Sequence, residues 1–156
     1  MKYLHKLISQ IEYSSIVAHG GIESLNDVKI TAVVCDSRLA GFDSLFVCID
    51  GARVDGHAFV RSAYDKGCRA FVVEKSISLP SDAVIISVSD TKSALPRLCA
   101  EFYSHPEKKL KLVGITGTKG KTSCALMLHA ILCASGIRAA YIGTNGISFL
   151  SRHYDT

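Results

Sequence analysis

The sequence lacks any long apolar run, any internal repeat and any low-complexity segment. A membrane-spanning helix needs about 20 consecutive apolar residues, so this pattern argues against a transmembrane protein. The first residues, MKYLHKLISQIEYSS, are amphipathic and not continuously apolar, which also argues against a secretory signal peptide. We therefore expect a cytoplasmic protein with no membrane partner.

Paired cysteine motifs are absent as well. None of the 6 cysteines forms a C-x-x-C pair, and most lie in apolar runs such as LFVCI. This spacing favours buried reduced thiols over a zinc site or a disulfide framework. The net charge of +4 is mild, and basic residues do not alternate with aromatic ones, so we expect no nucleic-acid partner.

The sequence does contain an alternation of strand and helix patterns. Hydrophobic residues make up 48% of the chain and charged residues 21%, which suits a globular core. Short runs rich in Val and Ile predict strands, and apolar residues at helical spacing predict helices. The strands are expected at 30–34, 45–49, 70–74 and 83–88, and the helices at 2–11, 55–66 and 91–103. This order predicts an α/β domain with a largely parallel sheet over residues 1–107.

A second unit is expected over residues 108–156. After the polar linker HPEKK, the pattern predicts a strand at 109–115, a glycine-rich loop, a helix at 122–135 and a strand at 139–143. The helix is apolar nearly all round, which predicts that it is buried. Because three such elements cannot bury it alone, we expect the chain to be a fragment of a longer protein.

The loop GITGTKGKTS has the composition of a phosphate-binding loop. It lacks the first glycine of the pattern G-x-x-x-x-G-K-S/T, where Ile115 stands instead. Two glycines let the backbone curl around an anion, and the amides at the start of the next helix point toward it. The alternative is a glycine-rich turn with a solvated lysine, which the position between an apolar strand and an apolar helix disfavours.

The chemistry of the loop assigns a role to each residue. Lys121 is placed to reach the β- and γ-phosphates of a nucleotide, and the Thr122 hydroxyl is placed to hold magnesium. Lys119 either contacts phosphate or points to solvent. The expected nucleotide-binding residues are Gly117, Thr118, Lys119, Gly120, Lys121, Thr122 and Ser123. The resemblance described next implies that they are ATP-binding residues and that Lys121 and Thr122 are catalytic.

The segment ITGTKGKTS resembles the ATP loop of the Mur ligase superfamily, whose form is T-G-T-x-G-K-T/S. Upstream, CDSRLAGFDSLFVCIDGARVDGHAFVRSAYDKGCRAFVVE is similar to the N-terminal UDP-binding domain of the MurE type. EFYSHPEKKLKLVGITGT and AYIGTNGI match the family's junction and its next strand. The resemblance spans about residues 25–148. It implies a Rossmann-like first domain followed by the opening of a P-loop α/β domain.

The resemblance implies a reaction in peptidoglycan precursor synthesis. ATP phosphorylates a carboxylate of UDP-N-acetylmuramoyl-L-alanyl-D-glutamate, and the amine of a diamino acid attacks the resulting acyl phosphate. ATP and Mg2+ are the implied cofactors. Whether the diamino acid is diaminopimelate or lysine stays open. A monomer is expected, and the fragment alone is expected to bind the UDP moiety but to be inactive.

The same resemblance implies a set of UDP-substrate contacts. Ser37 would offer its hydroxyl to uracil or ribose, and Arg53 either meets the diphosphate or is a solvated loop residue. Asp155 stands where the family more often has Asn. The contacts carried over by motif are Cys35, Ser37, Ala52, Arg53, Val54 and Thr156.

Other polar residues are expected to have structural roles. Asp36 and Arg38 are predicted to pair across a strand end, and His57 to fix its loop or cap its helix. His129, on an apolar helix, is predicted to be a hydrogen-bonded histidine of the core.

Two alternative functions remain open. A MurF-type ligase shares the D-G-H-x-F segment, although it more often has Ser where Thr118 stands, and the segment I-G-T-x-G favours MurE. The alternative from another class is a non-catalytic module that binds a UDP-sugar.

Overall fold

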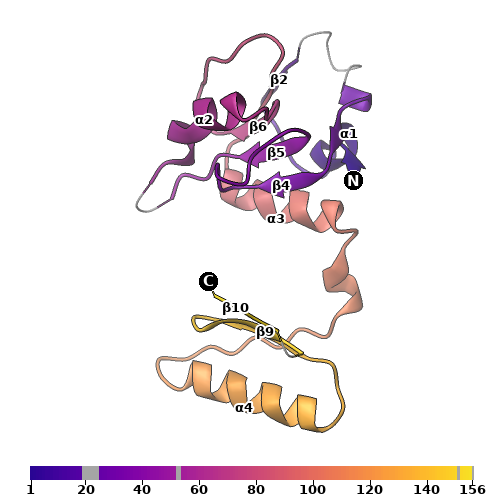
Figure 1. Ribbon diagram of the computed structural model, residues 1–156, viewed down its shortest axis with the longest axis vertical. Coiled ribbons are helices and arrows are strands. Elements are labelled where there is room, and N and C mark those ends of the chain that lie inside the picture. Colours follow the sequence, from indigo (N-terminus) through magenta and orange to yellow (C-terminus); the bar gives the residue numbers. More distant parts are fainter. Residues whose placement is uncertain (19–24, 52–53, 151, 156) are drawn as a thin grey trace. The chain divides into compact units, whose positions relative to one another are not determined.

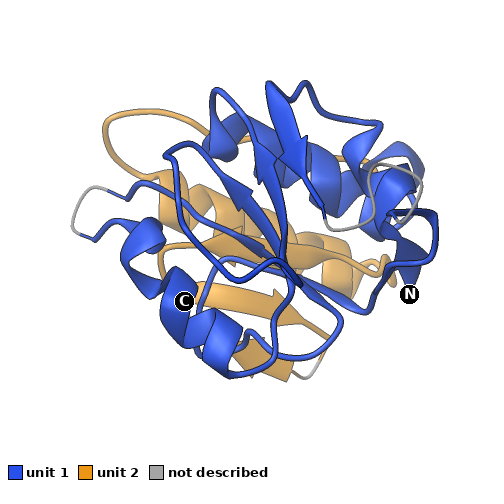
Figure 2. Cartoon of the chain, turned by 90° about the horizontal axis from the view of Figure 1, so that it is seen from above, with its two compact units in different colours: residues 1–110 blue, residues 111–156 orange. Residues whose placement is uncertain are grey.

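The computed structural model describes residues 1–18, 25–51, 54–150 and 152–155. The chain divides into two compact units, Met1–Leu110 and Lys111–Thr156 (Figure 2). The sequence places the boundary between residues 107 and 108.

Unit 1 contains a five-stranded sheet in the order β2-β7-β6-β5-β4 (Figure 1). Four neighbouring strands are parallel, and β2 pairs with β7 in the antiparallel direction at one edge. The strands are β2 (Ser15–Val17), β4 (Ala32–Val34), β5 (Ser44–Val47), β6 (Ala70–Val73) and β7 (Val84–Ser87). The four parallel strands lie where the Val- and Ile-rich runs predict them.

Helices cover both faces of this sheet, because side chains along a strand point alternately to its two sides. Leu45 and Val47 pack in a core with α1 (Leu4–Ile8) and α3 (Thr91–Phe102). Phe46 packs in a second core with α2 (Val60–Asp65) and with Phe71, whose ring meets it edge-on. Figure 1 shows α2 and α3 on opposite sides of the strands.

Local signals fix the ends of these helices. The Asp90 side chain caps α3 by accepting from the amides of Lys92 and Ser93. The helix continues through Pro96 to Phe102. A 3-10 turn, η2 (Gly56–Phe59), leads into α2.

Some short elements of unit 1 differ from the sequence predictions. The helix predicted at 2–11 covers only Leu4–Ile8, because β1 (Lys2–Tyr3) pairs with β3 (Lys29–Ile30) in a two-stranded ribbon. The β2 edge strand and the 3-10 turn η3 (Pro106–Lys109) are not predicted. Each is four residues or shorter, so none shows a period.

Unit 2 consists of α4 (Lys121–Ala134) and an antiparallel sheet in the order β10-β9-β8. The strands are β8 (Ala140–Gly143), β9 (Gly146–Phe149) and β10 (Arg152–Tyr154). The His129 ring ties α4 to the sheet, since its Nε2 lies 3.2 Å from the Ala139 carbonyl oxygen. The predicted hydrogen-bonded histidine is therefore present, although the ring is only half-buried.

Two predictions for unit 2 are wrong. The predicted strand at 109–115 does not form, because no neighbouring strand pairs with these residues, and Leu112 and Val113 are 74% and 68% exposed. The helix exists, but α4 has no buried residue. Met127 and Ile131 are 67% and 63% exposed. Among the described residues of unit 2 no partner element covers this apolar surface.

The cysteines are all free thiols. Cys48 and Cys68 are buried as predicted, and burial raises the pKa of Cys48 to about 12. Cys35, Cys124 and Cys133 are exposed, so the prediction of buried thiols is wrong for them. Cys124 and Cys133 lie on α4, whose surface is uncovered.

Candidate functional site

The glycine-rich loop ends in the first residue of α4. Gly117 and Gly120 have φ angles of +148° and +78°, and Gly120 occupies the N-cap position in the left-handed conformation. A residue with a Cβ is disfavoured at such angles. The first helical hydrogen bond runs from the Cys124 amide to the Gly120 carbonyl, at 2.9 Å. The sequence therefore folds into the turn that the loop pattern predicts.

The first turn of α4 presents unpaired amides to an incoming anion. The N-cap makes no side-chain hydrogen bond and no acidic residue lies in the first turn. The amides and the helix dipole therefore favour a negatively charged group at this end. Thr118, Lys119 and Ser123 are exposed, and Thr122 is half-buried.

Lys121 folds back over the loop, where its Nζ donates to the Gly117 carbonyl oxygen. This contact keeps the ammonium group within the loop and not in free solvent. A phosphate in the loop would offer a stronger, charged acceptor than a carbonyl. The residues of this loop therefore fit a nucleoside triphosphate.

The structure shows no ready-made metal site in the described ranges. No group of three or more His, Cys, Asp or Glu side chains gathers there. The Thr122 hydroxyl is a single hard oxygen ligand of the kind that Mg2+ accepts beside phosphate oxygens and water. The donor set therefore fits magnesium bound together with a nucleotide and not magnesium alone.

A second candidate site lies at the carboxyl ends of the parallel strands in unit 1. Since β4 and β5 are parallel neighbours, with Val34 opposite Phe46, the segments that follow them meet at one edge of the sheet. Cys35 and Ser37 follow β4, and Val54 follows β5. Ligands of open α/β sheets commonly bind outside this edge.

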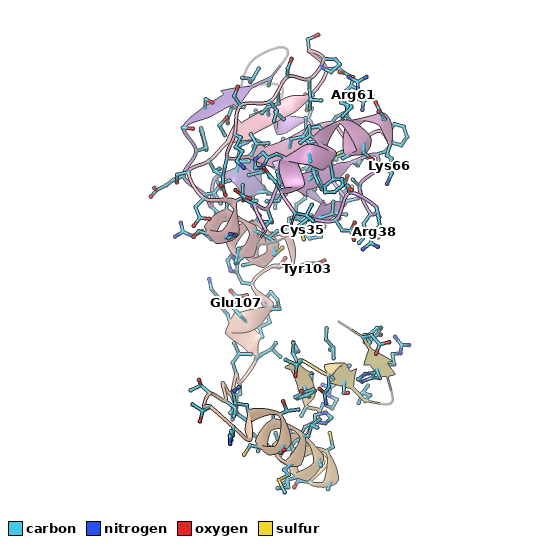
Figure 3. All side chains as sticks on the ribbon, turned by 90° about the vertical axis from the view of Figure 1, so that its left-hand side faces the viewer. Cys35, Arg38, Arg61, Lys66, Tyr103 and Glu107 are labelled. Carbon is cyan, nitrogen blue, oxygen red and sulfur yellow. The ribbon has the colours of Figure 1, made fainter. Side chains whose placement is uncertain are left out.

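The segment after β4 is held in place by charged groups. Arg38 donates to Asp36 through its amide at 2.9 Å and through its guanidinium at 2.6 Å, so the predicted pairing is present. The hydrogen bonds from Arg38 lower the pKa of Asp36 to about 2. Lys66 donates to the Ser37 carbonyl at 2.8 Å. Figure 3 shows Cys35, Arg38 and Lys66 on the same part of unit 1.

The two described ends of the segment after β5 are bonded to each other. Asp50 and Asp55 make a β-bridge, and the Gly51 amide donates to the Val54 carbonyl at 3.1 Å. Val54 is 56% exposed. The other predicted contacts, Ala52, Arg53 and Thr156, lie outside the residues that the structure describes.

Lys75 is a polar residue of this edge that the sequence analysis missed. It lies two residues after the end of β6 and donates to both Asp50 and Asp55, at 3.0 and 2.5 Å. A charged residue close to the end of a buried strand was the available signal. His57, predicted to fix its loop, does contact it: its Nδ1 lies 2.6 Å from the Asp55 carboxylate. The helix cap is Asp55 itself.

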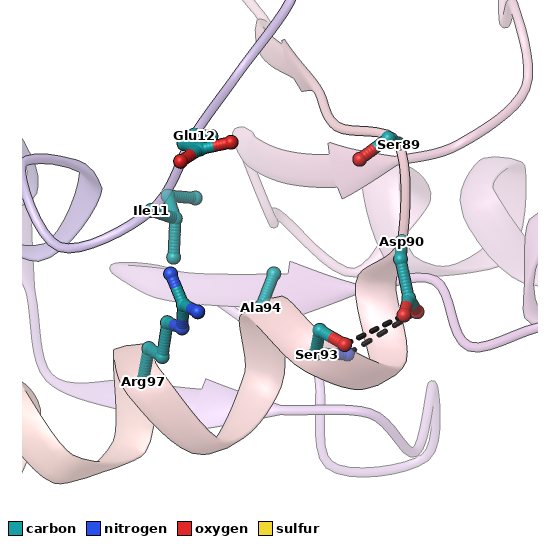
Figure 4. Close-up of a pocket in the computed structure, with 7 residues that line it drawn as sticks. All are labelled: Ile11, Glu12, Ser89, Asp90, Ser93, Ala94 and Arg97. Atoms are coloured by element: carbon teal, nitrogen blue, oxygen red, sulfur yellow. Dashed lines mark hydrogen bonds between the residues drawn. The ribbon is translucent and has the colours of Figure 1, made fainter.

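A pocket of about 260 Å³ lies beside the start of α3, and none of the predicted site residues lines it (Figure 4). Its polar groups include the Glu12 and Asp90 carboxylates, which disfavour phosphate. Asp90 is already bonded to Ser93 at 2.6 Å. The lining residues are Ile11, Glu12, Ser89, Asp90, Ser93, Ala94 and Arg97. This pocket is not assigned to the nucleotide.

Within the described part of the chain, no helix is both long and apolar enough to cross a bilayer.

Comparison with known proteins gives matches to one protein family. Residues 29–103 match the model of the Mur ligase family, catalytic domain. The chain is 38% identical over 144 residues to a UDP-N-acetylmuramoyl-L-alanyl-D-glutamate–2,6-diaminopimelate ligase of Clostridium botulinum, covering 90% of this chain and 28% of that protein. It is 41% identical over 141 residues to the ligase of the same name from Bacillus licheniformis, with 90% and 28% covered. The chain thus spans 28% of the length of these relatives.

Solved structures of two ligases also match the chain. A crystal structure of MurF from Acinetobacter baumannii matches with a TM-score of 0.65 and 28% identity, over 87% of this chain and 28% of that chain. A structure of UDP-N-acetylmuramoyl-L-alanyl-D-glutamate–2,6-diaminopimelate ligase matches with a TM-score of 0.66 over 97% of this chain and 29% of that chain. At 16% identity, the second match shows the fold alone. The predicted α/β class with a mostly parallel sheet is confirmed.

Proposed function

We propose that this chain, which belongs to the Mur ligase family, carries the UDP-binding region and the phosphate loop of an ATP-dependent ligase. The ligase adds a diamino acid to UDP-N-acetylmuramoyl-L-alanyl-D-glutamate in peptidoglycan precursor synthesis. The observation that carries the proposal is a single alignment of 144 residues, at 38% identity, with a relative named for this reaction. That alignment covers 90% of the chain. Residues 1–107 are proposed as the UDP-binding domain and 108–156 as the opening of the ATP-binding domain.

The proposed chemistry has two steps. A substrate carboxylate oxygen attacks the γ-phosphorus of ATP, the bond to ADP breaks, and an acyl phosphate forms. The amine then attacks the acyl carbon, the new C–N bond forms, the C–O bond to phosphate breaks, and the nitrogen loses a proton. The first step is a phosphoryl transfer, which depends on positioning and on neutralisation of charge.

The phosphate loop supplies that neutralisation. The amides at the start of α4 would bind phosphate oxygens, and Lys121 would exchange its contact with the Gly117 carbonyl for the β- and γ-phosphates. Thr122 would hold Mg2+, whose charge offsets the negative charge that develops on the phosphates. Lys119 and Ser123 complete the proposed loop contacts.

At the edge of the unit 1 sheet, the proposed UDP contacts are Cys35, Ser37 and Val54, together with Ala52, Arg53 and Thr156. The Ser37 hydroxyl would bind uracil or ribose. A cytoplasmic location is proposed, because both proposed substrates, ATP and the UDP-linked precursor, are soluble metabolites. The protein is also proposed to be a monomer.

The added amino acid is proposed to be diaminopimelate, which the names of the relatives specify. Lysine is the alternative. In the full gene product, turnover with diaminopimelate and not with lysine would support the assignment, and the reverse result would contradict it.

Calorimetric titration of UDP and of ATP into the 156-residue chain tests the proposal. UDP should bind, and Ser37→Ala should weaken it. ATP with Mg2+ should bind, and Lys121→Ala should weaken it about tenfold or more, since a charged phosphate contact is lost. Lys111→Ala, an exposed lysine of the same unit, is the control. No binding of UDP by calorimetry, together with no effect of Ser37→Ala by a second method, contradicts the assignment.

A MurF-type ligase is the second candidate, because solved structures with that name match well. One, a UDP-N-acetylmuramoylalanyl-D-glutamyl-2,6-diaminopimelate–D-alanyl-D-alanyl ligase of Acinetobacter baumannii, is 33% identical over 67% of this chain, with a TM-score of 0.54. The relatives of the first candidate reach 38% and 41% over 90% of the chain. A full gene product that accepts the UDP-muramoyl tripeptide and D-alanyl-D-alanine, and not the dipeptide, would favour this second candidate.

A further inference from the structure

Two free thiols lie on neighbouring elements of unit 1. Cys35 follows β4 directly, and Cys99 lies in α3, which packs against β4. Figure 1 shows α3 running alongside this strand. Cys35 is exposed, whereas Cys99 is half-buried. The fold thus brings together two cysteines that are distant in the sequence.

The strand and the helix both place their cysteine on the side where they meet. Side chains along a strand alternate between its two faces. Val33 packs against the core that contains α3, whereas Val34 packs against the other core. The position two residues after Val33, which Cys35 occupies, therefore belongs to the α3 side. On α3, Leu95 packs against the same core, and Cys99 follows it by four residues, so both lie on one face of the helix.

The pKa of Cys99 agrees with this placement. Burial raises this pKa above that of an ordinary thiol, and the negative charge of a Cys35 thiolate raises it further. A like charge acts on a pKa in this way only when it is close. Cys99 therefore keeps its proton at neutral pH, and the exposed Cys35 is the thiol that an oxidant meets first.

Solvent also reaches Cys99 from one side. Cys99 lines an open groove of about 440 Å³ beside the last turns of α3, together with Tyr103 and with Pro106 of η3. Thiols that solvent can reach are the ones that small oxidants modify. Both members of the pair are therefore accessible to such a molecule.

A second pair of thiols in unit 1 lacks this access. Cys48 and Cys68 are both fully buried in the core beside α2. The pKa of Cys48 is raised mainly by burial, then by the charges of Asp55 and Cys68, so these two thiols are also close. The Cys68 thiol donates to the carbonyl oxygens of Ser44 and Ala70, at 3.3 and 3.4 Å. This pair is expected to stay reduced, because no oxidant reaches it.

We propose that Cys35 and Cys99 are a modification site at which a peroxide forms a reversible disulfide. The Cys35 thiolate attacks one peroxide oxygen, the O–O bond breaks, and hydroxide leaves and takes up the proton that Cys35 had lost. Cys35 is then a sulfenic acid. The Cys99 sulfur attacks the Cys35 sulfur, the S–S bond forms, the S–O bond breaks, and water leaves with the Cys99 proton. The two thiols lose two electrons in total, which reduce hydrogen peroxide to two molecules of water.

The disulfide is reversible because a thiol reductant breaks it by thiol–disulfide exchange. Disulfides in the cytoplasm are usually transient and often sense oxidants. A reversible bond of this kind is therefore compatible with the cytoplasmic location proposed above.

The test is treatment of the 156-residue chain with hydrogen peroxide, followed by blocking of the remaining thiols and peptide mass spectrometry. Peptides joined through Cys35 and Cys99 should be the main disulfide product, and dithiothreitol should separate them. Cys48 and Cys68 should be recovered as free thiols. Circular dichroism before and after treatment shows that the chain remains folded.

Two variants assign the bond. Cys99→Ala should abolish it and leave Cys35 as a sulfenic acid, which dimedone labels. Dimedone should label Cys35 about fivefold less in the unaltered chain, because Cys99 consumes the sulfenic acid. The matched control removes both exposed thiols of α4, Cys124→Ser with Cys133→Ser, and should leave the bond between Cys35 and Cys99 intact.

Equal dimedone labelling of Cys35 in the unaltered chain and in Cys99→Ala, with no joined peptides, would show that the two sulfurs do not meet and would overturn the proposal. A main product in which Cys35 is joined to Cys124, to Cys133 or to a second copy of the chain would also overturn it. No nucleotide is present in this experiment, so its outcome is independent of the proposed function.

Discussion

The two units differ in how their apolar residues are covered, although both contain strongly apolar strands or helices. In unit 1, the strands β5 and β6 have only buried residues, and a hydrophobic core lies on each face of the sheet. In unit 2, α4 has no buried residue, and Tyr141 is the one buried side chain among those described. The hydrophobic pattern thus predicts the helix α4, whereas burial of its apolar residues depends on a partner being present.

The sharpest test of this contrast removes one large side chain from each unit. Phe71→Ala deletes a fully buried ring of unit 1 and should lower the free energy of unfolding by about 3–5 kcal/mol. Met127→Ala in α4, where the side chain is 67% exposed, should change it by less than about 0.5 kcal/mol. Urea unfolding followed by circular dichroism measures both. A large effect of Met127→Ala would mean that α4 is covered in solution.

The same contrast explains which parts of the fold follow from sequence. The runs at 45–49 and 70–74 are buried on both faces and rich in β-branched residues, so their strands are found with boundaries within two residues. The run at 109–115 has similar composition but forms no strand. A strand exists only when it pairs, and pairing involves residues distant in sequence. The β1 and β3 strands, of two residues each, are too short to show a period.

The two parts of the candidate site also differ in how far the sequence predicts them. The proposed phosphate loop is a local feature. The left-handed φ angles of Gly117 and Gly120 and the contact of Lys121 with the Gly117 carbonyl involve only neighbouring residues, so a local motif can predict this turn. The ion pairs of Lys75 with Asp50 and Asp55 join residues that are 25 and 20 positions apart. No local pattern signals such a contact, and only the parallel pairing of β5 and β6 brings the two strand ends together.

A second test compares threonines in the first turns of α3 and α4. Thr91 is fully buried and its hydroxyl is bonded to Glu74, so Thr91→Val should lower the free energy of unfolding by about 1–3 kcal/mol. Thr122 is half-buried in unit 2, and Thr122→Val should cost less than about 0.5 kcal/mol. Thermal denaturation of the two variants measures the difference. Equal losses would contradict the contrast between the units.

A third test uses the glycines that follow α2 and α4. Gly67 and Gly136 both have left-handed φ angles, +98° and +77°. An Ala at either position costs about 1–2 kcal/mol in backbone strain. At Gly67 the new Cβ would also meet the Phe42 ring at 2.8 Å, but that ring is 80% exposed and can move aside.

The two glycine variants should therefore destabilise different parts of the chain. Gly67→Ala should lower the melting temperature of the sheet of unit 1. Gly136→Ala should instead speed amide exchange at the end of α4 and leave that melting temperature unchanged. If Gly136→Ala lowers it equally, the two units unfold as one, and the comparison between them has to be abandoned.

The smallest expected effect is a pH dependence confined to unit 1. The hydrogen bonds from Arg38 lower the pKa of Asp36 from 3.8 to about 2. The unfolded chain therefore binds this proton more readily than the folded chain. The contribution of Asp36 to stability is complete above about pH 4 and is lost as the pH falls through about 2. Because the carboxylate is exposed, screening by solvent keeps the contribution small.

Asp36→Asn removes this titration. Melting temperatures of the variant and the unaltered chain should differ slightly at pH 7 and converge as the pH approaches 2. A difference for Asp36→Asn that stays constant down to pH 2 would show that the pair with Arg38 does not form in solution. The segment that carries Ser37 would then be held by Lys66 alone.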